Sequence, residues 1–136
     1  MNNSELIRLA LEARKKSYSP YSGFSVGAAL LCDDGTVYTG CNIENSAFSP
    51  TNCAERTAFF KAVSEGKRDF VKIAVVGGES NAEIPANYCP PCGVCRQVMK
   101  EFCSGDFEII VAKNTEDFKV ITLSELLPLS FDKREV

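Results

Sequence analysis

The hydrophobic residues of this chain fall into blocks whose spacing alternates between that of a helix and that of a strand. Near the N-terminus they recur at helical spacing, which predicts a helix from a cap at Ser4 to about Ser17. A continuous apolar run over 24–31 predicts a buried strand. The sequence Asp-Asp-Gly at 33–35 then predicts a tight turn into a second strand over 36–42.

The same alternation continues toward the C-terminal end. Thr51 or Asn52 could cap a helix over about 53–65, which ends at Gly66. The further elements that we expect are strands at 71–76, 107–112 and 119–122, a helix at 92–103 and a short helical turn at 124–127. This order predicts a single α/β domain over residues 1–136, built as a three-layer α/β/α sandwich around a five-stranded mixed sheet.

The charge pattern argues against a polymeric or membrane partner. The chain has 15 Lys and Arg against 18 Asp and Glu, a formal net charge of −3, and no basic stripe suited to a phosphate backbone. No apolar run approaches the roughly 20 residues of a membrane span. The first residues lack the basic start and apolar core of a signal peptide. We therefore expect a cytoplasmic protein whose partners include neither a nucleic-acid polymer nor a membrane.

The cysteine and histidine content narrows the chemistry. The chain has seven cysteines and no histidine. In a small chain without an export signal, dense cysteine favours metal binding or catalysis over disulfides. Because histidine is missing, a metal site must use thiolates and carboxylates, and a general base must be Asp, Glu, Cys, Lys or Tyr.

Two short segments combine cysteines with a carboxylate. Cys53 precedes Glu55 by two residues at one predicted helix start, and Cys92 and Cys95 lie three positions apart at another. A helix N-terminus stabilises thiolate over thiol, and thiolate is the form that binds zinc. Three cysteine ligands leave the fourth zinc position open, which is typical of a catalytic site. Glu55 would lie beside that position and serve as a proton shuttle.

These segments also match a known signature. A ligand followed by any residue and Glu, and later by Pro-Cys-x-x-Cys, is the pattern of zinc nucleobase deaminases. Four ordered blocks resemble the small homotetrameric cytidine deaminases, over a stretch from about Glu5 to Phe131. The blocks lie at 24–30, 40–45, 53–58 and 91–97. Cys53 stands where many relatives carry His. The resemblance implies hydrolytic deamination of free cytidine and deoxycytidine to uridine and deoxyuridine, in pyrimidine salvage.

The resemblance also implies roles for other residues. Asn42 and Glu44 correspond to the pair that hydrogen-bonds the ribose hydroxyls, and Phe24 to an aromatic residue beside the nucleoside. The backbone N–H of Ala54 would meet the pyrimidine 2-oxo group. Phe131 corresponds to an aromatic residue that enters a neighbouring subunit's site, so we expect a homotetramer with shared active sites. From the residues alone, the polar pair could instead be turn residues and the two phenylalanines core residues.

The charge of the expected metal site must be balanced. One zinc ion per chain held by three thiolates has a net charge of 2 − 3 = −1, which is costly to bury alone. Arg56 follows Cys53 by one helical turn and could donate hydrogen bonds to the thiolate sulfurs, a role that the resemblance supports. In the expected reaction a zinc-bound hydroxide attacks ring C4 while Glu55 carries protons to ring N3 and to the leaving ammonia.

Other interpretations stay open at this stage. Cys89 forms a second Cys-x-x-Cys spacing with Cys92, so a closed four-cysteine zinc site or a thiol-redox pair would make the protein a binding module. A deaminase of a cytosine-containing antibiotic such as blasticidin S would share the fold and the zinc motif, although the block 42–45 favours the ordinary nucleoside. Phe48 replaces a Tyr of several relatives, and the segment 79–88 is long and distinctive.

Overall fold

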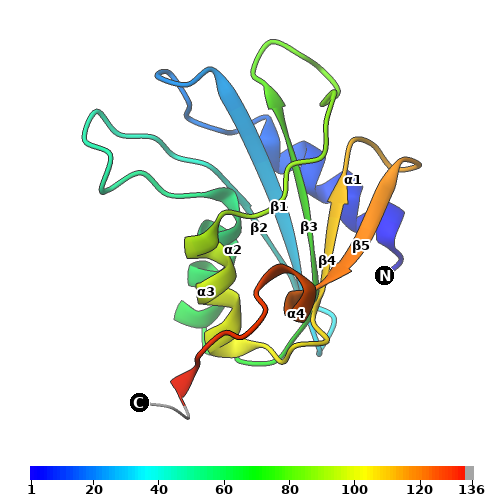
Figure 1. The fold of residues 1–136 in the computed structure, drawn as a ribbon. Helices are drawn as coiled ribbons and strands as arrows, with labels where there is room; N and C mark the ends of the chain where they lie inside the picture. The colour runs from blue at the N-terminus through cyan, green and yellow to red at the C-terminus, as the bar shows by residue number, and fades with distance from the viewer. Residues whose placement is uncertain (134–136) are drawn as a thin grey trace.

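The computed structural model describes residues 1–133 and is built on a five-stranded mixed sheet (Figure 1). The strands are β1 (Phe24–Cys32), β2 (Val37–Cys41), β3 (Phe70–Glu79), β4 (Glu108–Ala112) and β5 (Phe118–Thr122). They lie in the order β2-β1-β3-β4-β5. The β3–β4 pair is parallel and the other three pairs are antiparallel. The parallel pair is possible because a helix crosses over between these two strands.

Helices cover both faces of the sheet (Figure 1). The helices are α1 (Asn3–Arg14), α2 (Ala54–Ser64), α3 (Gly93–Phe102) and α4 (Leu123–Leu126). The first packs on one face and the other three pack on the opposite face, which confirms the predicted three-layer α/β/α sandwich. Within residues 1–133, every helix is too short or too polar to cross a membrane.

The central strands divide their side chains between two cores. On β3, Ile73 and Val75 face α2 and α3, whereas Ala74 and Val76 face α1. Because both faces of the sheet are covered, these strands are continuous apolar runs rather than alternating ones. Under α2 and α3 the core is aromatic: the Phe59 ring packs against three other phenylalanine rings at centroid distances of 5.0–6.4 Å. This packing holds the two helices that carry the candidate metal ligands.

The start of α1 differs from the prediction. Asn2 caps the helix in place of Ser4, because Asn2 and Glu5 form a reciprocal capping box. The Ser4 hydroxyl instead donates to a backbone carbonyl of the β4–β5 turn, at 2.8 Å. The helix also ends at Arg14 rather than near Ser17. Both corrections concern helix ends, and at the first of them the local pair of Asn2 and Glu5 decides the boundary.

The helix α2 begins directly after a candidate metal ligand. Cys53 is its N-cap residue, whereas the sequence predicts Thr51 or Asn52 in that position. The Asn52 amide instead donates to the Thr57 hydroxyl at 3.1 Å. Cys92 is the N-cap residue of α3, and neither cysteine side chain makes a capping hydrogen bond. Both sulfurs are therefore left to other partners.

The first turn of α2 lies very close to β2. A Cβ atom at Gly40, in β2, would lie 2.4 Å from the carbonyl oxygen of Ala54 and 2.7 Å from the backbone nitrogen of Ala58. Glycine permits this approach because it has no Cβ atom. The contact sets the distance between the sheet and the helical turn that carries Cys53 and Glu55.

Candidate functional site

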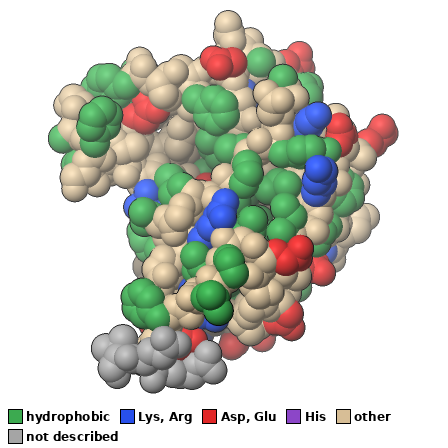
Figure 2. Space-filling view, in the orientation of Figure 1, with side chains coloured by type: hydrophobic (Ala, Val, Ile, Leu, Met, Phe, Trp, Pro, Cys, Tyr) green, Lys and Arg blue, Asp and Glu red, His purple; other side chains and the backbone are tan. Residues whose placement is uncertain are grey.

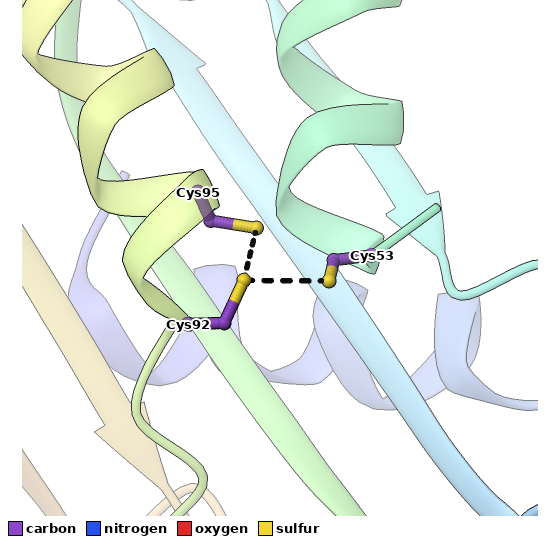
Figure 3. A group of neighbouring side chains, drawn as sticks. All are labelled: Cys53, Cys92 and Cys95. Carbon is purple, nitrogen blue, oxygen red and sulfur yellow. Dashed lines mark hydrogen bonds between the residues drawn. The ribbon is translucent and has the colours of Figure 1, made fainter. Parts of the chain in front are cut away.

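Three cysteine sulfurs meet between the N-terminal ends of α2 and α3 (Figure 3). The Sγ atom of Cys92 lies 3.7 Å from that of Cys53 and 3.5 Å from that of Cys95. All three sulfurs lie within 4.8 Å of one another. The fold therefore brings together the three thiols that the sequence predicts as ligands, from two helices separated by a strand.

The sulfur separations suit a zinc ion. Tetrahedral Zn–S bonds of about 2.3 Å place neighbouring sulfurs about 3.8 Å apart. The separations of 3.5 and 3.7 Å found here are close to that value. The Cys89 thiol lies outside the cluster. Three protein ligands leave one coordination position for water or substrate, which is typical of a catalytic rather than a structural zinc site.

Hydrogen bonds and positive charge favour the ionised form of one sulfur in this cluster, that of Cys53. The hydrogen bond with Cys95 is the main cause of a lowered pKa of Cys53, and a hydrogen bond of 3.3 Å from the Arg56 guanidinium adds to it. Cys95, as the partner in that bond, has a raised pKa. A cation bound by all three sulfurs would displace the remaining thiol protons. Arg56 is therefore placed as expected, against a thiolate whose negative charge it offsets.

A small cavity opens beside the sulfurs. Its volume is about 190 Å³, and its walls include Cys53, Cys92 and Glu55, which we call its metal end, together with Asn42 and Glu44. The remaining lining residues are Val26, Thr51, Asn52, Ala54, Cys89 and Pro90. A larger cavity of about 610 Å³ is lined by no cysteine and by none of the predicted site residues. The smaller cavity is therefore the candidate site. Figure 2 shows the surface recessed between the loop that projects after β2 and the body of the molecule.

Glu55 supplies the buried carboxyl group of this cavity. Its side chain lies in the first turn of α2, and the residue is only 4% exposed. Burial raises the pKa of Glu55 to about 7. A carboxyl group with a pKa near neutral can both accept and release a proton, as general acid–base catalysis requires. A metal cation beside it would lower that pKa and favour the ionised form, which accepts the first proton.

At the other end of the cavity, Asn42 is held by the backbone of β1. Its Oδ1 atom accepts a hydrogen bond from the Val26 N–H at 2.9 Å, and its Nδ2 atom donates to the Phe24 carbonyl at 2.8 Å. The residue is 9% exposed. The side chain is therefore a fixed polar group in the cavity wall, and the sugar-binding role that the resemblance implies for it stays a prediction.

Glu44 is held by the segment that precedes β1. Its carboxylate accepts hydrogen bonds from the backbone N–H groups of Tyr21 and Ser22, at 3.0 and 3.1 Å, and from the Ser22 hydroxyl. That hydroxyl is the main cause of a lowered pKa of Glu44. The sequence gives no signal for Ser22, or for Ser17 beside Asn42, because these serines lie 22 and 25 residues from their partners.

The other predicted substrate contacts divide into two groups. Ala54 begins α2 and lines the cavity. Phe24 and Phe131 do not line it. Phe24 is 37% exposed, and Phe131 is 57% exposed with its carbonyl accepting a hydrogen bond from the Gln97 side chain at 3.3 Å. The cavity of one chain thus contains the metal ligands and a polar wall, while both phenylalanines lie outside this cavity.

Comparison with known proteins agrees with this geometry. The family of the cytidine and deoxycytidylate deaminase zinc-binding region matches residues 1–112. A cytidine deaminase of Sporosarcina psychrophila is 51% identical over 136 residues, which cover 100% of this chain and 96% of that protein. A blasticidin-S deaminase of Bacillus cereus is 30% identical over 131 residues, covering 95% of this chain and 91% of that protein.

Solved structures show the same fold. The crystal structure of a cytidine deaminase from Burkholderia pseudomallei superimposes with a TM-score of 0.86 at 44% identity, covering 96% of this chain and 100% of that one. The matching region is a zinc-binding region, and Cys53, Cys92 and Cys95 are positioned here to hold a metal ion. The site, the sequence and the fold together show that this chain belongs to the zinc-dependent cytidine deaminase family.

Proposed function

We propose that this protein hydrolyses the 4-amino group of free cytidine and deoxycytidine, yielding uridine or deoxyuridine and ammonia. One observation carries the proposal: the buried Glu55 carboxyl shares a cavity wall with two of the three clustered thiols. A proton carrier beside an open metal position suits hydrolysis, whereas a structural zinc site or a redox pair would leave this carboxyl without a role. Membership of the cytidine deaminase family supports the choice of substrate.

Cys53, Cys92 and Cys95 would hold one zinc ion per chain. Bound there, zinc supplies the Lewis acidity that makes water a nucleophile near neutral pH. Three thiolates weaken that acidity, and the hydrogen bond from Arg56 to Cys53 would partly restore it by withdrawing negative charge from the sulfur. The two helix N-termini that meet at the cluster act in the same direction.

Glu55 would carry the protons of the reaction. It takes a proton from the attacking water and delivers it to ring N3, while the oxygen of that water bonds to ring C4. It would then take the second proton from the oxygen on C4 and deliver it to the amino nitrogen, so that the C4–N bond breaks, ammonia leaves and C4 keeps a carbonyl oxygen. The Ala54 N–H, in the first turn of α2, has no acceptor within the helix and would donate to the 2-oxo group of the pyrimidine. One helix start thus serves the ring and the proton transfers.

Asn42 and Glu44 would bind the sugar. One amide N–H of Asn42 is not used by the backbone of β1, and the Glu44 carboxylate keeps room for another donor beside those from Tyr21 and Ser22. A donor and an acceptor side by side suit a hydroxyl group, which can accept from one and donate to the other. Phe24, whose carbonyl accepts a hydrogen bond from Asn42, would pack beside the nucleoside.

We also propose a homotetramer in which neighbouring subunits complete the sites. The cavity of about 190 Å³ is small against the roughly 300–1,000 Å³ of most small-molecule sites, so a further wall is expected. Phe48 is 93% exposed and Phe131 is 57% exposed, and both would be buried by a neighbouring copy. Light scattering at dilute concentration tests the assembly, and an active species with the mass of one chain would refute it. A cytoplasmic location suits the cluster of free thiols, because cytosolic thiols stay reduced.

The activity test follows the loss of cytidine absorbance with purified protein, with metal analysis of the same sample. We expect turnover of cytidine and deoxycytidine and one zinc per chain. Blasticidin S and free cytosine are run in parallel. Turnover of blasticidin S alone would assign the antibiotic as substrate, and zinc without any turnover would point to a binding module.

A further inference from the structure

The orientation of the Asn42 amide is set by the backbone groups that it meets. A backbone N–H can only donate and a carbonyl can only accept, so the contacts with Val26 and Phe24 decide which end of the amide is oxygen. The Ser17 hydroxyl oxygen lies 2.5 Å from that oxygen and must therefore donate to it. Both lone pairs of Oδ1 are then occupied. Asn42 is left with one N–H for the cavity and can act there only as a donor.

Glu44 is fixed with the opposite polarity. One carboxylate oxygen accepts two backbone N–H groups and the other accepts the Ser22 hydroxyl. A carboxylate offers about four acceptor positions, so roughly one is left for a ligand. The lowered pKa of Glu44 keeps the carboxylate ionised and hence without a proton to donate. Toward the cavity, Glu44 can act only as an acceptor.

Both serines belong to one segment, residues 15–23, which joins α1 to β1. This segment runs beside residues 42–44. The Tyr18 N–H donates to the Asn42 carbonyl at 3.0 Å, and the Glu44 N–H donates to the Tyr18 carbonyl at 2.8 Å. These backbone bonds set the register that brings one serine hydroxyl to each polar side chain.

We propose that Ser17 and Ser22 are positioning residues for recognition of the nucleoside sugar. They fix Asn42 as a donor and Glu44 as an acceptor, so that the pair selects a hydroxyl group over a group that only accepts or only donates. The inference rests on the proposed function and extends it to the residues that set the polarity of the sugar site. Neither serine lines the cavity that holds Glu55 and the sulfurs, so their effect should fall on binding and leave the chemical step unchanged.

The test compares Ser17→Ala and Ser22→Ala with Ser80→Ala as a matched control. The Ser80 hydroxyl joins the same group of serines, bonding to Ser19 and Ser25, but contacts neither Asn42 nor Glu44. We expect Ser17→Ala to raise the KM for cytidine about three- to tenfold, and Ser22→Ala about tenfold or more, because a hydrogen bond to a charged group contributes more. The kcat should stay within about twofold of wild type, and Ser80→Ala should leave both constants unchanged.

A substrate series separates positioning from a general structural role. Cytidine, 2′-deoxycytidine and 3′-deoxycytidine are each measured with wild type and the alanine variants. The loss should vanish for the analogue that lacks the hydroxyl held by Asn42 and Glu44, and persist for the nucleosides that keep it. Ser17→Thr, which retains a hydroxyl, should restore the wild-type KM. Thermal melting of each variant checks the fold, and if Ser17→Ala fails to fold, Ser22→Ala carries the same test.

An equal loss on all three nucleosides, or a fall in kcat at unchanged KM, would overturn the proposal. So would alanine variants that match wild type. The outcome is distinct from a failure of the proposed function, in which wild type itself turns over none of the three nucleosides.

Discussion

The two ends of the cavity are held by different forces. At the metal end, the sulfurs and Glu55 lie at the starts of α2 and α3, and these helices pack on the aromatic core around Phe59. At the other end, proposed to bind the sugar and called the sugar end below, Asn42 and Glu44 follow the last residue of β2. They are held by hydrogen bonds from β1 and from the segment that leads into it. The comparison separates a part of the site set by packing from a part set by polar contacts.

The difference has a direct consequence for how each end should respond to change. Packed helices move as units, and a misplacement of about 1 Å in a catalytic group can cost roughly a hundredfold in rate. A single hydrogen bond contributes only about 0.5–1.5 kcal/mol, or about 1.5–3 kcal/mol when one partner is charged. We therefore expect changes at the metal end to abolish turnover and changes at the sugar end to weaken binding by degrees.

The sharpest way to break this comparison is to remove a ligand. Cys92→Ser replaces a thiolate with a neutral hydroxyl, so we expect loss of bound zinc and of nearly all turnover. Metal analysis and the cytidine assay measure the two losses. Cys89→Ser is the matched control for zinc content, since its sulfur lies in the same cavity but outside the cluster. Zinc that stays with Cys92→Ser, or leaves with Cys89→Ser, would show that the ligand set is wrong.

The next largest effect is expected for Glu55→Gln. The amide keeps the shape of the side chain but cannot carry protons, so kcat should fall about 10²–10⁴-fold. Zinc content and melting temperature should stay near wild type, because the ligands and the core are untouched. More than about a tenth of the wild-type kcat would contradict the assigned role, given that range.

Truncation tests whether a third region contributes to the site. Deleting the residues from Pro128 onward removes Phe131 and should lower activity about tenfold or more, on the order of the loss of one anchoring aromatic side chain at an interface. Zinc should remain, since the thiols precede the deleted segment. Phe131→Ala should reproduce the loss, whereas Leu129→Ala, which changes a fully exposed side chain of the same tail, should have a smaller effect. If the truncated protein and both alanine variants were as active as wild type, the tail would not be part of the site.

At the sugar end, the effect is expected on binding alone and not on the chemical step. Glu44→Gln keeps a carbonyl acceptor but loses the charge, so the KM for cytidine should rise about tenfold or more with little change in kcat. Steady-state kinetics measure the two constants separately. Glu12→Gln, on the exposed side of α1, provides the matched change at a remote acid. A fall in kcat with unchanged KM would place Glu44 with the chemistry rather than with the sugar.

The metal end could be predicted from the sequence because its signals are local. Cys92 and Cys95 share a helical turn, and Cys53 and Glu55 share another, so helix starts and spacing suffice to find them. The sugar end needs pairs that are distant in sequence. The resemblance suggests Asn42 and Glu44, but Ser17 and Ser22 meet them only after β1 and β2 have paired.

The cap of α1 illustrates a different limit. Asn2 and Ser4 are both good N-cap residues, and the sequence favours Ser4 only when each residue is judged without the one three positions later. The choice depends on Glu5, which lies three residues after Asn2 and completes the capping box. The exposure of Phe48 and Phe131 could not be predicted either, since phenylalanine is usually buried and nothing in the neighbouring sequence marks these two as exposed.

The close contact at Gly40 makes the metal site sensitive to change at a residue that is not one of its ligands. A methyl group at this position would push the first turn of α2 away from the sheet and carry Cys53 away from the two sulfurs on α3. A random screen for inactive variants should therefore return Gly40→Ala among proteins that bind zinc weakly, although position 40 touches no sulfur. In such a screen, grouping variants by their zinc content would be more informative than grouping them by distance from the site. The reason is that the side chain at position 40 sets the position of α2, and the position of α2 sets the affinity for the metal.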